Sequence, residues 1–163
     1  MLASAFGAVI GSYLTGNPWI GVLFAILVGV LISAIHSVIS ITWGGNQSVS
    51  SMALVLLATG FSGVGLKSIF GQQGSSPQVA SLEHTPILSP FVYIAFIVLA
   101  LVHCLFKYTP LGLRIITVGE NPRAAETAGL SVHKIRYFSV ILSGVLGGLG
   151  GAFLSLGQMN LFQ

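Results

Sequence analysis

Charged residues are scarce in this chain, and none lies in its first 66 positions. The 163 residues include six basic and three acidic side chains, while hydrophobic residues make up 54%. A soluble domain carries about a quarter charged residues. A long segment without Asp, Glu, Lys or Arg cannot form an ordinary solvated surface. Because a soluble protein would have to bury several separate apolar runs at once, we predict an integral membrane protein.

The sequence also lacks recognisable catalytic, nucleotide-binding and metal-binding motifs. Neither paired carboxylates nor a nucleophile beside a base stands out. The stretch GFSGVGLKS at 60–68 departs from a phosphate-binding P-loop because Leu66 separates Gly65 from Lys67. The histidines are dispersed, without the spacing of metal ligands, at positions His36, His84, His103 and His133. We therefore predict no enzyme, no ATPase, no metal site and no cofactor.

Apolar runs of the length needed to cross a bilayer are abundant. A spanning helix needs about 17–25 residues. The predicted spans are 18–41, 48–66, 90–106 and 137–157, preceded by a first span at 1–14 that is shorter than this range. Asn17-Pro18 and Ser89-Pro90 each place a capping side chain before a proline at the first helical position. These features predict an all-α, polytopic transmembrane bundle of about five spans, forming a single domain over residues 1–163.

The basic residues predict the orientation of the bundle. Five of the six lie between the fourth and fifth spans, namely Lys107, Arg114, Arg123, Lys134 and Arg136. Basic residues favour the cytoplasmic side of a membrane, so we predict that 107–136 is a cytoplasmic loop of a multi-pass cell-membrane protein. Alternation then places the polar 67–89 connection outside. The net charge of +3 is explained by this loop and does not indicate nucleic-acid binding.

A short helix is predicted inside the basic loop. Asn121 is a suitable N-cap, Pro122 suits the first helical position, and Gly129 suits the position just after the helix. The predicted helix is 122–128, about two turns long. An isolated helix this short is marginal in water, so it needs a docking surface on its own bundle or on a partner. Spacing alone leaves a capped connector and a docking element equally open.

A polar cluster lies at the start of the third span. Asn46 and Ser50 are four residues apart, as are Gln47 and Ser51, so each pair shares a helix side. Uncharged hydrogen-bonding groups suit a polar, uncharged solute, and these four residues are candidates for the translocation path. The alternative is an interfacial cap or serine-mediated helix packing, which we favour for Ser48.

Glycines recur in the fifth span at helical spacing. Gly144 and Gly148 form one small-xxx-small pair, and Gly147 and Gly151 form another. Such pairs let helix backbones approach closely. We predict helix packing for them in preference to contact with a solute.

One stretch carries a family resemblance. The segment GENPRAAETAGLSVHKIRYFSVILSGVLGGLGGAFLSLG resembles the permease subunits of ABC importers for simple sugars, nucleosides and branched-chain amino acids. The spacing of Ala124, Ala125 and Gly129 is similar to the Ala-Ala-x-x-x-Gly core of the importer motif, although Arg123 replaces its acidic residue. The resemblance implies that the loop couples the permease to an ATPase through residues Asn121, Pro122, Arg123, Ala124, Ala125, Glu126 and Gly129.

A second stretch, HSVISITWGGNQSVSSMALVLLATG, resembles the nucleoside and simple-sugar members of the same family. Family permeases are longer, with further spans on both sides, so we expect this chain to be incomplete. The resemblance implies three protein partners: a second permease subunit, cytoplasmic ABC ATPase subunits and an extracytoplasmic solute-binding protein. Two alternatives stay open, an ATP-independent channel or carrier and a non-transporting membrane scaffold. Carriers driven by ions often keep ionisable groups in their spans, and none with a formal charge occurs here.

Overall fold

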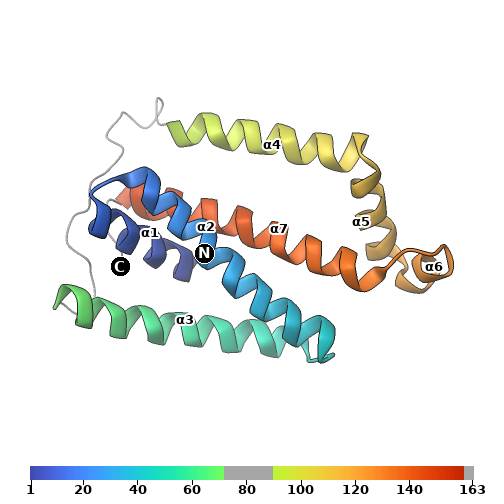
Figure 1. The fold of residues 1–163 in the computed structure, drawn as a ribbon, viewed down its shortest axis with the longest axis horizontal. Coiled ribbons are helices and arrows are strands. Elements are labelled where there is room, and N and C mark those ends of the chain that lie inside the picture. The colour runs from blue at the N-terminus through green and yellow to red at the C-terminus, as the bar shows by residue number, and fades with distance from the viewer. Residues whose placement is uncertain (72–89, 160–163) are drawn as a thin grey trace. The chain divides into compact units, whose positions relative to one another are not determined.

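The computed structural model describes residues 1–71 and 90–159, and every regular element in these two stretches is helical. Contacts between Cα atoms divide the chain into two compact units. The first comprises residues 1–83 and 141–163, and the second comprises residues 84–140. Figure 1 shows the helices of both units. The predicted all-α membrane bundle is confirmed, with a lower number of full-length spans than predicted.

The first unit begins with two helices joined by a tight turn. Helix α1 (Leu2–Thr15) ends where Gly16 adopts the left-handed conformation, with φ at 66°. Helix α2 (Pro18–Ser37) begins at the predicted cap, where the Asn17 side chain accepts a hydrogen bond from the Trp19 amide at 3.1 Å. It continues through the π-helical turn η1 (Val38–Thr42). Proline at the first position and asparagine before it thus fix the start of α2.

Two further helices complete the described part of the first unit. Helix α3 (Gln47–Phe70) begins after Asn46 and ends at Gly71, whose φ is 68°. The last turns of helix α7 (Val132–Ala152) and the π-helical η2 (Phe153–Met159) also belong to this unit. Helix α3 covers the predicted 48–66 span and extends past it at both ends. Helix α7 together with η2 does the same for the predicted 137–157 span.

The second unit differs from the prediction. Helix α4 (Pro90–Tyr108) matches the predicted fourth span, and Ser89 lies outside the described residues. Residues 107–136, which we predicted to be a loop with one short helix, contain a second helix, α5 (Pro110–Glu120), followed by α6 (Pro122–Thr127) and the start of α7. The axis of α5 is bent by 75° from that of α4. Thr109 caps α5 and Pro110 opens it, which are the start signals that the sequence analysis used elsewhere and overlooked here.

Three of the predicted spans are long and apolar enough to cross a membrane: α2 with η1, α3, and α7 with the start of η2. The bent pair α4–α5 adds a fourth if it is counted as one span. Helix α1 has only 14 residues, about 21 Å at 1.5 Å per residue, against a hydrocarbon thickness of about 30 Å. The described residues therefore hold three or four full-length spans and one shorter apolar helix.

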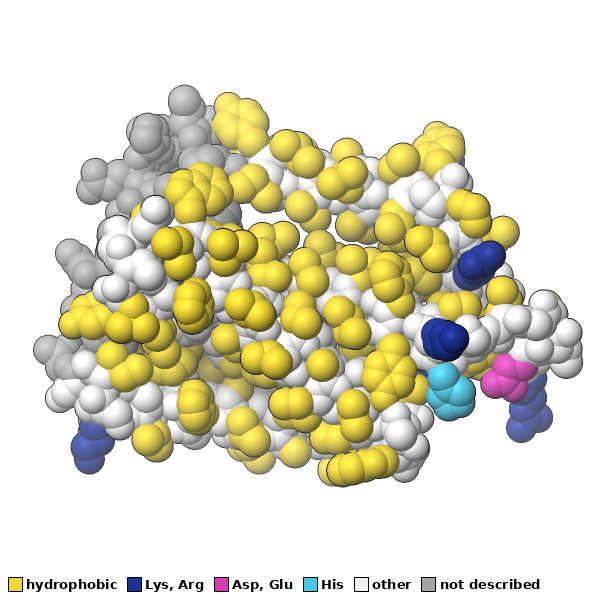
Figure 2. Space-filling view, viewed as in Figure 1, with side chains coloured by type: hydrophobic (Ala, Val, Ile, Leu, Met, Phe, Trp, Pro, Cys, Tyr) yellow, Lys and Arg dark blue, Asp and Glu magenta, His cyan; other side chains and the backbone are white. Residues whose placement is uncertain are grey.

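Burial in the first unit differs from that of a soluble protein. The interior contains small residues such as Ser4, Ala8 and Ala25, beside an apolar cluster that includes Phe6 and Leu66. Large apolar side chains point outward: Leu56 is 73% exposed and Phe61 is 70% exposed. On the face shown in Figure 2, hydrophobic side chains cover most of the helix surface. Lipid tails are as apolar as these side chains, so such a surface is stable in a bilayer, while small residues let the helices approach.

Helix α2 and the end of α7 approach each other closely in the first unit. A Cβ atom added at Gly29 would lie 2.5 Å from the Gly144 carbonyl oxygen, and one added at Gly148 would lie 2.8 Å from backbone atoms of Ala25 and Ile26. Gly151 makes a similar approach to α1, where an added Cβ would lie 2.7 Å from the Met1 carbonyl oxygen. An added Cβ at Gly147, by contrast, has no neighbour within 4 Å.

This difference between adjacent glycines gives a paired prediction. Gly148→Ala should destabilise the purified protein by about 1–3 kcal/mol, because the backbone atoms of α2 cannot move away without opening the helix pair. Gly147→Ala should be neutral or stabilise by up to about 1 kcal/mol, since alanine is the better helix former. Thermal unfolding in detergent, followed by circular dichroism, measures both. Equal effects of the two substitutions would contradict the proposed packing.

Candidate functional site

The charged part of the second unit is built from two capped helices. The Thr109 hydroxyl donates to the Leu105 carbonyl at 2.5 Å and accepts from the Gly112 amide at 3.2 Å, which links the end of α4 to the start of α5. The Asn121 side chain accepts from the Ala124 amide at 3.2 Å and begins α6. Figure 2 shows Lys, Arg, His and acidic side chains gathered over α5, α6 and the start of α7.

Helix α6 ends one residue before the predicted end, and the residue after its C-cap is the predicted Gly129. The helix stops at Thr127, and Gly129 has a φ of 80°, a conformation that glycine adopts without steric cost. The amide of Gly129 donates to the Glu126 carbonyl at 2.9 Å, and the amide of Leu130 donates to the Ala125 carbonyl at 3.0 Å. These bonds satisfy carbonyls that would otherwise be left free at the helix end.

Side-chain burial shows which face of α6 is occupied by its own chain. Ala125 is fully buried in an apolar cluster with Val118 of α5 and Val132 of α7. Leu130 and Ile135 pack against the same cluster. A helix too short to be stable alone is thus held by its neighbours in the second unit. The side chain of Ala125 is consequently not available to a partner, although the sequence analysis named it among the coupling residues.

Most of the other predicted coupling residues are exposed. Arg123, Ala124 and Glu126 are exposed, as is Gly129 just after the helix. Asn121 is exposed but its side chain serves as the cap, and Pro122 is half-buried. The exposed surface of α6 therefore has only a methyl side chain at Ala124, and it carries one positive charge on Arg123 and one negative charge on Glu126.

The candidate translocation residues occupy the start of α3. Asn46 is the N-cap, and its side chain accepts from the Ser48 amide at 3.0 Å. Gln47 and Ser51 are exposed, and the Ser51 hydroxyl donates to the Ser48 carbonyl at 2.8 Å. Ser50 is buried, with 5% of its surface exposed. The four candidates are thus brought to one helix end, and Asn46 has a capping role there.

One residue at this end was not selected from the sequence. The Nδ1 atom of His36, in the last turn of α2, lies 3.1 Å from the Ser50 hydroxyl oxygen and is within hydrogen-bonding distance. An ionisable side chain inside an apolar run is a candidate for function in a membrane protein. The sequence analysis considered His36 only as a metal ligand. Within the described residues, no three His, Cys, Asp or Glu side chains gather as a metal site would require.

Comparison with known proteins connects these features to a family. Residues 1–161 match the family described as the branched-chain amino acid transport system, permease component. No solved structure matches the chain significantly.

Individual relatives match along almost the whole chain. The guanosine ABC transporter permease protein NupQ of Bacillus subtilis is 36% identical over 93% of the chain. The nucleoside ABC transporter permease protein NupC of Lactococcus lactis is 35% identical over 93%. A putative glucose ABC transporter permease protein of Haloferax volcanii is 35% identical over 99%. The chain spans 54%, 55% and 54% of the lengths of these relatives.

The burial of Ala125 predicts different outcomes for two neighbouring substitutions. Ala125→Glu should open the α5–α6–α7 cluster, because a buried unpaired carboxylate costs several kcal/mol. Ala124→Glu should leave the cluster intact, since this position is exposed. Hydrogen exchange of residues 118–132 in the detergent-solubilised protein measures the effect. Comparable protection in both variants would show that α6 is not held through Ala125.

Proposed function

The chain belongs to the family of branched-chain amino acid transport permease components, and we propose that it forms part of the membrane-spanning subunit of an ATP-driven solute importer. The observation that carries the proposal is the family match over residues 1–161. The exposed face of the capped helix α6 supports it, because a short helix held by its own chain presents a fixed surface to a partner. The permease itself performs no chemistry in this proposal.

The proposed partner of α6 is a cytoplasmic ABC ATPase subunit. Ala124 exposes only a methyl group, so a partner surface can come close to the helix backbone. Arg123 and Glu126 flank it, each with a side chain exposed to solvent. Exposed ion pairs contribute only about 0–1 kcal/mol, so these charges orient the partner more than they hold it. A second permease subunit and an extracytoplasmic binding protein complete the proposed assembly, in which segment 107–136 is cytoplasmic.

The proposed solutes are nucleosides or simple sugars, with nucleosides favoured. Two of the relatives are named as guanosine and nucleoside permeases, and a third as a putative glucose permease. Asn46, Gln47, Ser50 and Ser51 offer uncharged hydrogen-bonding groups of the kind that such solutes need, and His36 lies beside Ser50. We place these residues in the translocation path as part of the same proposal.

Substitution of Ala124 tests the coupling role without disturbing the fold. Ala124→Glu in the assembled transporter should lower ATPase co-purification and guanosine-stimulated ATP hydrolysis in proteoliposomes about tenfold or more, which corresponds to about 1.4 kcal/mol of contact free energy. Ala124→Ser, which keeps a small side chain at the same position, should behave as the unaltered protein. Full association and stimulation in the glutamate variant would reject the coupling role and favour an ATP-independent channel or a scaffold.

A further inference from the structure

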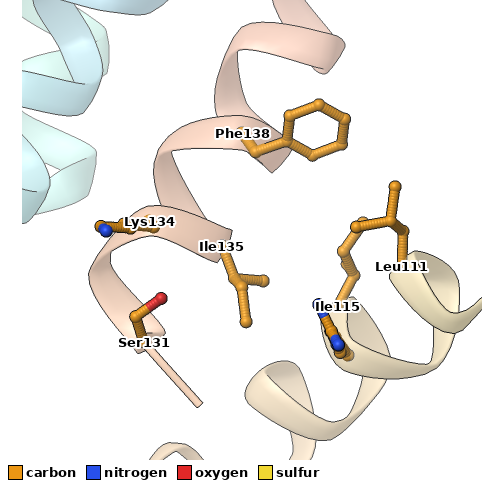
Figure 3. Close-up of a pocket in the computed structure, with 7 residues that line it drawn as sticks. Leu111, Ile115, Ser131, Lys134, Ile135 and Phe138 are labelled. Atoms are coloured by element: carbon orange, nitrogen blue, oxygen red, sulfur yellow. The ribbon is translucent and has the colours of Figure 1, made fainter.

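A pocket lies within the second unit, between α5 and the start of α7. Its volume is about 230 Å³, and it is lined by Leu111, Arg114, Ile115, Ser131, Lys134, Ile135 and Phe138. Figure 3 shows Leu111 and Ile115 on one helix, with Ile135 and Phe138 on the other. The lining thus combines four large apolar side chains with two cations.

The size and lining of the pocket restrict its occupant. Pockets that enclose a whole small molecule have volumes of about 300–1,000 Å³. At about 230 Å³ this one can hold only part of a longer molecule. A sugar or nucleoside would leave the apolar side chains without a matching surface. An apolar chain attached to an anionic group matches both parts of the lining.

The two cations are available to an anion. Arg114 and Lys134 are both exposed, and neither forms a salt bridge with a carboxylate in the described part of the chain. The acidic residues described in this unit are Glu120 and Glu126, and neither lines the pocket. The local charge is therefore positive and uncompensated.

Helix α5 differs in direction and in surface from the apolar helix α4 that precedes it. The 75° bend after α4 turns the chain away from the direction of that apolar helix. Leu113 and Ile116, three residues apart on α5, are 66% and 45% exposed. A helix with exposed apolar residues and an arginine beside a spanning segment suits the boundary between headgroups and acyl chains.

We propose that this pocket binds an anionic phospholipid. The headgroup phosphate binds Arg114 on α5, Lys134 adds positive charge on the α7 side, and the first part of one acyl chain covers Leu111, Ile115, Ile135 and Phe138. Basic pockets between membrane helices bind anionic headgroups in this way. The occupied pocket fastens α5 to the start of α7 and so steadies the cluster that holds α6. The inference requires only that the chain lies in a bilayer, so it can hold or fail separately from the proposed coupling to an ATPase.

Native mass spectrometry of the detergent-purified chain tests the site. The protein is mixed with equal amounts of dioleoyl phosphatidylglycerol and dioleoyl phosphatidylcholine, and the retained lipids are counted. The unaltered chain should retain the anionic lipid preferentially. Arg114→Gln combined with Lys134→Gln should reduce this preference about tenfold or more. A control that removes two cations elsewhere, Lys67→Gln with Arg123→Gln, should keep it.

A pocket-filling variant tests the acyl-chain part independently. Leu111→Trp keeps both cations and should reduce retention of both lipids, with helix content checked by circular dichroism.

Equal retention of the two lipids by the unaltered chain would overturn the proposal, as would an equal loss in the control variant. Unchanged lipid retention in the Arg114/Lys134 variant, together with loss of ATPase co-purification, would assign the pocket to the ATPase. If Leu111→Trp loses helix content, the two charge variants decide the outcome alone.

Discussion

The close approach of α7 to α2 is the constraint on which the first unit depends. In a bilayer, apolar side chains gain nothing by leaving lipid for protein, so helices associate through packing and hydrogen bonds. Gly29, Gly144 and Gly148 remove side chains from the helix crossing, and the backbones meet there. Many large apolar residues, such as Leu56 and Phe61, are exposed at the outer surface, while Phe6 and Leu66 are buried in a small apolar cluster. Small residues at this crossing therefore allow the two helices to pack without a large apolar interface.

A different kind of packing holds the charged segment. Val118, Ala125 and Val132 form a small apolar cluster that resembles the core of a soluble protein. It stabilises the six-residue helix α6, whose own hydrogen bonds are too few to do so. The Asn121 cap and the turn at Gly129 then fix both ends of α6. One face of the helix is thereby used for folding, and Arg123, Ala124 and Glu126 remain exposed to solvent.

Much of this arrangement could be predicted from local sequence. Asn17-Pro18 fixed the start of α2, and the caps of α6 were assigned to the right residues, because capping depends on side chains within three positions. Helix α5 was missed since its charged residues were interpreted only as a loop with a topology signal. The inward position of Ala125, the pairing of His36 with Ser50, and the difference between Gly147 and Gly148 depend on contacts with other helices, which a single sequence does not contain.

Coupling to an ATPase requires that the segment with α5, α6 and the start of α7 lies on the cytoplasmic side of the membrane. Cysteine labelling in intact cells measures this directly, in a Cys104→Ser background. Thr127→Cys, exposed at the end of α6, should react with a membrane-impermeant thiol reagent only after the cells are opened. Ser75→Cys, in the 67–89 connection that the charge pattern places outside, should react in intact cells. The reverse labelling pattern would contradict the orientation and remove the basis for coupling to an ATPase.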